Sequence, residues 1–273
     1  MPGVDEGTNI ASLRGMPVNL TTWETAEVRR SRLEALHTPA QQLVADEKNV
    51  ARYLDPSLDT AYPLEYAFAV LGDVRRSVVL DFGCGSGGNT LLLSRRAAHV
   101  IAIDISPDLI RLARRRLAMN GATAQFVLGS AHYLPLDAES VDVVFGNAIL
   151  HHLDLDAAAR EVHRVLKSGG RAIFKEPVRD SPLVRRVRGW VPYRTPDVSP
   201  HERPLSAAEI AQFAMRFRSS SARAFCLPFV SVTHVVPPLQ RYMAGAYRLD
   251  AAVLKRFPRL TPFAGVRVLH LWK

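Results

Sequence analysis

The sequence predicts an α/β fold in which helices cover both faces of a parallel sheet. Short apolar runs rich in β-branched residues alternate with helices through the centre of the chain, and capping residues mark the helix ends. Of the 273 residues, 48% are apolar and 22% are charged, which is enough to bury a core and excludes a disordered chain. Strand, helix and strand in this order join parallel strands through crossovers.

The N-terminal part reads as a tail followed by helices. Residues 1–20 are rich in Gly, Pro, Asn and Thr without a period, so we expect a flexible tail. Over residues 22–70 apolar side chains, among them Leu33 and Leu36, recur every three or four positions. Three prolines divide this stretch into two or three helices, which form an N-terminal helical cap at 21–72.

The centre of the chain carries the expected sheet and its clearest helix. Ser106 can cap a helix, Pro107 fits the first helical position, and Gly121 ends it. A second helix over residues 156–167 stops at Gly169. Five apolar runs have the length of buried strands: Ser77–Phe82, His99–Asp104, Gln125–Leu128, Val141–Phe145 and Arg171–Lys175.

After Pro177 the alternation gives way to an Arg- and Pro-rich segment, residues 178–204. Ser206 and Glu209 then have the spacing of a capping box, ahead of a helix that we expect to reach Phe217. The rest of the chain is predicted to form a strand, a helical stretch that acts as a lid, and a last strand that brings the sheet to seven: Ala222–Val232, Leu239–Phe257 and Gly265–Trp272.

Charge and cysteine content further restrict the class of protein to which the chain can belong. The net charge is +9, and residues 177–273 hold 16 of the 35 basic side chains but 5 of the 26 acidic ones. Two cysteines, Cys84 and Cys226, exclude a disulfide framework and a four-thiolate zinc site, and no metal is expected. The sequence has neither a basic leader with an apolar core nor the roughly 18 to 20 apolar residues of a membrane helix, so we expect a cytoplasmic protein.

The strongest motif is the glycine-rich turn Gly83–Gly88, between a buried strand and a helix. Such a turn lets a ligand approach the backbone at the end of the strand. It also fits the dinucleotide pattern G-x-G-x-x-G, which leaves a nicotinamide dehydrogenase as an alternative. Asp81 before the turn would repel a pyrophosphate and attract an ammonium, and Asp104 can accept from both hydroxyls of a ribose. This pair fits S-adenosylmethionine, a nucleoside with a cationic amino-acid tail, better than a dinucleotide.

Five segments, in order and at fitting spacings, resemble the motifs of class I S-adenosylmethionine-dependent methyltransferases, most closely the small-molecule branch with the ubiquinone/menaquinone-type enzymes. They are Val78–Gly88, Ile101–Pro107, Phe126–Leu136, Val141–Leu153 and Val165–Glu176. The resemblance implies a Rossmann-like class I methyltransferase fold, with an S-adenosylmethionine-binding core at 73–177. Residues 178–273 would then complete the sheet and supply acceptor-binding lid helices.

The resemblance also implies which residues bind the cofactor, with one departure. Ser130 stands where the family commonly has an acidic residue that accepts from the adenine amino group. A hydroxyl can still accept one hydrogen bond, so we expect a weaker adenine contact without loss of the cofactor. The implied cofactor-binding residues are Asp81, Gly83 and Gly85 at the methionine moiety, Gly87 in the same turn, Asp104 and Ile105 at the ribose and adenine, Ser130 and Ala131 beside the adenine, and Asn147 under the methionine part.

Three residues are candidates for catalysis. Methyl transfer is an in-line displacement that depends mainly on alignment and exclusion of water, and a base helps when the acceptor is a hydroxyl. His151 and His152 follow the fourth strand; at most one should face the acceptor, and His151 is slightly favoured. The alternative is that both only form hydrogen bonds at a helix start. Glu176, at the end of the fifth strand, is another candidate base or acceptor-binding group, unless it pairs with a nearby arginine.

The predicted function is methylation of a small cyclic metabolite, with oxygen favoured and natural-product or secondary-metabolite biosynthesis as the setting. Alternatives are C-methylation of a quinone or lipid-like acceptor, and a catalytically silent cofactor-binding regulatory or partner protein. Aromatic residues of the flanking segments suit an aromatic acceptor, and the arginines of residues 179–194 suit an anionic one. Those arginines also fit peripheral contact with an acidic membrane or a solvated surface. A nucleic-acid partner is disfavoured because aromatic residues do not interleave the basic stretch; the oligomeric state is not predicted.

Overall fold

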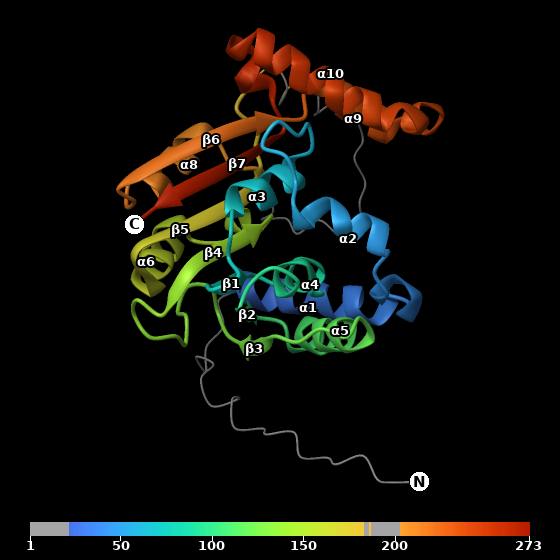
Figure 1. The fold of residues 1–273 in the computed structure, drawn as a ribbon. Helices are drawn as coiled ribbons and strands as arrows, with labels where there is room; N and C mark the ends of the chain where they lie inside the picture. The colour runs from blue at the N-terminus through green and yellow to red at the C-terminus, as the bar shows by residue number, and fades with distance from the viewer. Residues whose placement is uncertain (1–21, 183–185, 187–202) are drawn as a thin grey trace.

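The computed structural model describes residues 22–182, 186 and 203–273, so the tail expected at 1–20 lies outside the described residues (Figure 1). The sheet has seven strands in the order β3-β2-β1-β4-β5-β7-β6. Strands β1 to β5 are mutually parallel, whereas β7 runs antiparallel to β5 and β6. The predicted seven-stranded, mostly parallel sheet is confirmed. The strands are β1 (Val78–Phe82), β2 (His99–Asp104), β3 (Gln125–Leu128), β4 (Val141–Asn147), β5 (Leu166–Pro177), β6 (Ser219–Phe225) and β7 (Val266–Trp272).

Helices cover both faces of the sheet, because successive strand residues point to opposite sides. In β1, Val79 packs with Phe68 in one core, while Leu80 packs with Val162 and Phe213 in the other. The first face carries α2 (Glu47–Leu54), α3 (Pro63–Leu71) and α4 (Gly88–Ser94), and the second carries α6 (Leu155–Val165) and α8 (Ala207–Ala214). Helix α5 (Pro107–Met119) also covers the first face, where its Ile110 packs with Ala102 of β2.

The predicted helix starts agree with the structure. The Ser106 hydroxyl accepts from the backbone nitrogen of Leu109 at the start of α5, and Pro107 is its first residue. Ser206 and Glu209 form the capping box of α8. That helix ends at Ala214, before the expected Phe217.

The strand expected at Ala222–Val232 was wrong in its second half. Strand β6 ends at Phe225, and Cys226 turns the chain with a positive φ of 62°. Pro228 then begins the helix α9 (Pro228–Val235), because its fixed φ suits a first helical position and its missing N–H cannot join a sheet. The remaining C-terminal elements are η4 (Pro237–Tyr242), α10 (Met243–Arg256) and η5 (Pro258–Phe263).

The N-terminal helix α1 (Thr22–His37) packs along α5, and η2 (Ala40–Leu43) follows it (Figure 1). Leu33 and Leu36, expected on a buried apolar face, are 55% and 71% exposed. Ser31 is instead buried on the inner side. The helix is therefore oriented with polar side chains toward the rest of the protein.

Candidate functional site

The glycine-rich turn joins β1 to α4 and requires glycine for different reasons at different positions. Gly83, Gly85 and Gly87 all have positive φ values, between 51° and 80°. A Cβ at Gly83 would lie 2.6 Å from the side chain of Ile149, and one at Gly87 would lie 2.8 Å from Ala113. At Gly85 no heavy atom lies within 4 Å of the Cβ position. The backbone of Gly85 therefore faces open space, where a ligand can approach closely.

Asp104 ends β2 and holds the glycine turn in place. One carboxylate oxygen accepts from the backbone nitrogen of Gly85 at 2.8 Å, and the other accepts from that of Ser106 at 2.9 Å. Burial raises the pKa of Asp104, and the nearby charges of Glu27 and Glu34 add to the rise, while the two hydrogen bonds oppose it. The carboxylate is thus well positioned but poorly solvated, which favours a ligand that brings hydroxyl donors or positive charge.

Asp81 lies behind the turn, on the face covered by α4. It is 1% exposed, and one carboxylate oxygen accepts from the Thr90 hydroxyl at 2.6 Å. Burial raises the pKa of Asp81 to about 7; the charge of Asp104 adds to the rise and the Thr90 hydrogen bond opposes it. A carboxyl group that resists ionisation in this place becomes easier to ionise when a cation binds nearby.

A cavity opens at the carboxyl edge of the sheet, between the ends of β1 to β4 and α1. It encloses about 1040 Å³ of space between atoms, open solvent at its mouth included. Of the nine expected cofactor-binding residues, Asp81 lies behind the turn and Gly87 packs against Ala113, and neither is part of the described wall. The other seven line the cavity: Gly83, Gly85, Asp104, Ile105, Ser130, Ala131 and Asn147.

Helix α1 supplies a wall that the sequence did not predict. Glu24, Glu27, Ser31 and Glu34 follow one another at steps of three or four residues and all line the cavity. The Ser31 hydroxyl oxygen is buried and has no hydrogen-bond partner among the described residues. The signal in the sequence was a polar stripe at helical spacing, whereas an apolar stripe is the usual sign of an inward face.

The charge of the cavity wall is predominantly negative. Three glutamates of α1 and Asp104 line the cavity, together with one guanidinium, that of Arg30. Arg30 pairs with Glu27 at 2.6 Å, so its charge is already partly balanced. An acidic wall of this kind attracts a cationic ligand and disfavours the pyrophosphate of a dinucleotide.

The histidine pair lies on η3 (Leu150–His152), which Glu176 holds in place. One Glu176 oxygen accepts from the backbone nitrogens of Ile149 and Leu150, both at 2.9 Å. The other lies 2.9 Å from Nδ1 of His151. Glu176 is fully buried and is not part of the described cavity wall, so it acts by positioning this turn. The sequence suggested an arginine as its possible partner, whereas its described partner is His151.

Of the two histidines, the described cavity wall contains His152. His151, which the sequence slightly favoured as the residue facing the acceptor, is 7% exposed and lies 2.9 Å from Glu176. Its ring packs on that of His152, with 4.0 Å between the ring centroids. Nδ1 of His152 lies 3.7 Å from a carboxylate oxygen of Glu27. The histidine that faces the cavity is thus supported by its neighbour on one side and by α1 on the other.

Several predicted acceptor features lie elsewhere or outside the described residues. Tyr62 packs on Tyr247 at 4.8 Å between ring centroids, and these rings join α3 to the C-terminal helices. Within 22–182, 186 and 203–273, no group of three or more His, Cys, Asp or Glu is placed to hold a metal ion. Nor does any helix of those residues have the length and apolar character needed to cross a bilayer. In the arginine-rich segment, Arg179 and Arg186 are described, whereas Arg185, Arg188 and Arg194 lie outside the described residues.

Comparisons with known proteins show the class to which this fold belongs. Residues 80–174 match the family described as "Methyltransferase domain". In the solved structure of geranyl diphosphate C-methyltransferase from Streptomyces coelicolor the fold is shared with a TM-score of 0.59, at 16% identity, over 94% of this chain and 99% of that one. The fold is therefore that of class I methyltransferases.

Two curated relatives are similar to the central part of the chain. Malonyl-[acyl-carrier protein] O-methyltransferase from Hamiltonella defensa is 29% identical over 150 residues, which are 54% of this chain and 55% of that protein. Demethylmenaquinone methyltransferase from Clavibacter sepedonicus is 39% identical over 117 residues, which are 40% of this chain and 44% of that protein. The chain spans about half the length of each relative. Residues 80–174 thus form a methyltransferase domain, and this part of the chain is similar to class I S-adenosylmethionine-dependent methyltransferases.

Proposed function

We propose that the chain binds S-adenosylmethionine and transfers its methyl group to a small cyclic acceptor, with an acceptor oxygen favoured. The observation that carries this proposal is the acidic cavity at the sheet edge, where Asp104 and the open backbone of Gly85 stand side by side. When bound, S-adenosylmethionine supplies a methyl group on a sulfonium that is already activated for displacement. The negative wall suits that cation, and the Ser31 hydroxyl, which has no partner among the described residues, offers a further hydrogen bond to a ligand.

In this proposal, different residues around the cavity contact different parts of the cofactor. Asp104 accepts from the ribose hydroxyls with the lone pairs that its backbone contacts leave available. The side-chain oxygen of Asn147 accepts from Lys175 at 3.0 Å, which leaves its amide nitrogen to donate to the carboxylate of the amino-acid tail. Asp81 lies behind the turn and outside the cavity wall, so its proposed contribution is the negative charge that it gains when the cationic cofactor binds nearby.

His152 is the proposed base for a hydroxyl acceptor. It lines the cavity, as Asn147 does, and its ring is held between His151 and Glu27. Proton removal by a histidine so held would leave an oxygen aligned for in-line attack on the methyl group. His151 and Glu176 are positioning residues, because they act through the turn that carries His152.

C-methylation of a quinone or lipid-like acceptor is the second candidate. It is supported by the 39% identity with a demethylmenaquinone methyltransferase and by the likeness in fold to a geranyl diphosphate C-methyltransferase. Carbon NMR of the product formed with an isotopically labelled methyl donor separates the two, because a methyl group bound to oxygen and one bound to carbon have distinct chemical shifts. The proposed setting is natural-product biosynthesis in the cytoplasm. Both cysteines are free, as a reducing compartment allows. In this proposal the acceptor is a small molecule, and residues within 178–273 cover it.

Calorimetric titration with S-adenosylhomocysteine tests the cofactor. Two glycines offer a matched pair of variants, because Gly85 and Gly121 both have positive φ and neither has a heavy atom within 4 Å of the position that a Cβ would take, yet only Gly85 lines the cavity. We expect Gly85→Ala to weaken binding about tenfold or more, and Gly121→Ala to leave affinity unchanged at a similar backbone cost. No binding to the unsubstituted protein at millimolar ligand would overturn the proposal.

A further inference from the structure

The topology decides which end of the cavity receives the base of the cofactor. With the ribose at Asp104 on β2, the end of β3 lies on one side and the ends of β1 and β4 on the other. His152 follows β4, so the reacting end of the ligand belongs to that side and the base to the β3 side. The cavity wall there includes the apolar side chains of Ile105, Leu109 and Ala131, which suit a planar ring.

A carboxylate stands at this end of the cavity, and it comes from α1. An oxygen of Glu24 accepts from the Ser130 hydroxyl at 2.6 Å and lies 3.3 Å from Nδ1 of His132. The Glu24 side chain is 11% exposed, and both Glu24 and Ser130 line the cavity. The Ser130 hydroxyl therefore donates to Glu24, whereas the sequence suggested that it accepts from the ligand. The acidic group that position 130 lacks is supplied from a distant part of the chain.

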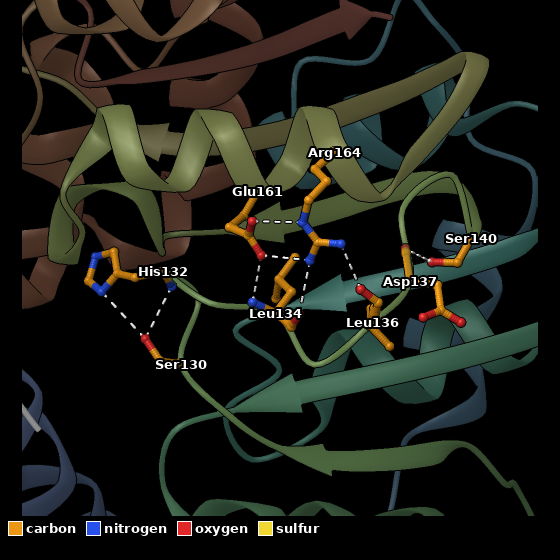
Figure 2. A network of polar contacts seen from close by, with 8 residues as sticks. All are labelled: Ser130, His132, Leu134, Leu136, Asp137, Ser140, Glu161 and Arg164. Carbon is orange, nitrogen blue, oxygen red and sulfur yellow. Dashed lines mark hydrogen bonds and ion pairs between the residues drawn. The ribbon is translucent and has the colours of Figure 1, made fainter. Parts of the chain in front are cut away.

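The loop that meets Glu24 is fixed independently of any ligand. Figure 2 shows Ser130 and His132 turned toward each other on the stretch that leads to Leu134. Glu161 on α6 accepts from the backbone nitrogen of Leu134 at 2.7 Å, and Arg164 donates to the Leu134 carbonyl at 3.0 Å. Because the loop is anchored on α6, the site of contact with Glu24 is defined before a ligand binds.

A carboxylate in this place distinguishes between purine bases. The exocyclic amine of a 6-aminopurine donates a hydrogen bond that a carboxylate accepts, whereas the oxygen of a 6-oxopurine is itself an acceptor and is repelled. Ser31, on the same face of α1, has a buried hydroxyl without a partner among the described residues, which is a second sign that this helix face is completed by a ligand.

We propose that Glu24 accepts a hydrogen bond from the exocyclic amine of the cofactor's adenine and makes the site selective for a 6-aminopurine. This inference rests on the proposed function, since it presupposes that the cavity takes a nucleoside cofactor. It assigns a binding role to a helix that lies outside the matched domain of residues 80–174.

The test compares two ligands on the full chain by calorimetric titration: S-adenosylhomocysteine and S-inosylhomocysteine, which carries oxygen in place of the amine. For the unsubstituted protein we expect at least a tenfold preference for the adenosine ligand, as one charge-assisted hydrogen bond supplies. In Glu24→Ala the preference should fall to within about threefold, with the loss confined to the adenosine ligand. Adding Ser130→Asp to that variant should restore the preference, because it returns a carboxylate to the same end of the cavity.

Glu27→Gln is the matched control, since Glu27 lies on the same face of α1 but contacts Arg30 and His152. It should change both affinities by the same factor and leave their ratio unaltered. An undiminished preference in Glu24→Ala, with both ligands still bound, would overturn the role of Glu24 and leave the proposed function standing. Absence of binding to the unsubstituted protein would remove the proposed function itself. Should Glu24→Ala fail to fold, Glu24→Gln decides in the same way, because its amide donates to a 6-oxo group.

Discussion

Replacing Asp81 by asparagine should raise the free energy of unfolding of the cofactor-free protein, and the size of this increase should depend on pH. Burial raises the pKa of this carboxyl from 3.8 to about 7. Between these values the native protein holds a proton that the unfolded chain has released, so stability falls as pH rises; above about pH 7 both states are ionised and the penalty is constant. Asparagine has the same shape, keeps an oxygen to accept from Thr90, and has no charge to bury.

The size of the effect follows from the same pKa. At pH 5 the native carboxyl is protonated, and it loses its proton at about pH 7. The free energy of unfolding therefore falls over the two pH units from pH 5 to pH 7, by about 1.4 kcal/mol per unit, and not from pH 7 to pH 8. The advantage of Asp81→Asn in free energy of unfolding should therefore grow by about 3 kcal/mol between pH 5 and pH 8. Urea unfolding of both proteins at the two pH values measures it.

A matched control is Asp142→Asn. Burial raises the pKa of Asp142, but the hydrogen bonds from Lys167 and from the backbone of Val78 outweigh it, and the pKa is lowered overall. This carboxyl is ionised in both states at pH 5 and at pH 8, so its replacement should destabilise equally at both. If the difference between Asp81→Asn and the unsubstituted protein is also the same at both pH values, the buried ionisation of Asp81 does not exist.

Three further outcomes are expected around the site. His152→Ala should lower turnover of a hydroxyl acceptor about 100-fold or more while S-adenosylhomocysteine affinity changes less than twofold, and unchanged turnover would clear His152 of a role as base. Glu176→Gln should lower the free energy of unfolding by about 1 to 3 kcal/mol in urea, because the amide cannot accept from both backbone nitrogens and His151; an unaltered unfolding midpoint would contradict this. Gly87→Ala should cost about 1 to 3 kcal/mol in the same assay, since the new Cβ would meet Ala113 at 2.8 Å at a φ of 80°.

Much of the fold could be predicted because its signals are local. The cap at Ser106, the proline after it and the capping box at Ser206 each act within one helical turn, and all three appear in the structure. The boundary between β6 and α9 was missed because the β-branched residues after Pro228 favour a strand, while the proline itself starts a helix. The strand propensity of these β-branched residues competed there with the fixed φ of Pro228, and the proline determined that a helix forms.

The candidate site likewise has a part that the sequence predicts and a part that it does not. Asp104, Ser130 and Asn147 could be placed at one edge because the carboxyl ends of parallel strands meet there, whatever the side chains do. The pairing of His151 with Glu176 joins β5 to the turn after β4, and no spacing in the sequence indicates it. Such contacts depend on register and side-chain direction, which the pattern of apolar residues leaves undetermined.

Helix α1 shows why this site is polar at a cost in stability. An ordinary helix buries its apolar side, whereas α1 exposes Leu33 and Leu36. It turns glutamates toward the cavity, together with the Ser31 hydroxyl, for which the described part of the chain offers no partner. Glu27 and Glu34 in turn raise the pKa of Asp104, which burial has already raised. The Asp104 carboxylate and the Ser31 hydroxyl are less well solvated in the protein alone than in water, and both improve when a cation with hydrogen-bond donors occupies the cavity. The unfavourable terms are therefore concentrated where the proposed cofactor would relieve them, as differential stabilisation by a bound ligand requires.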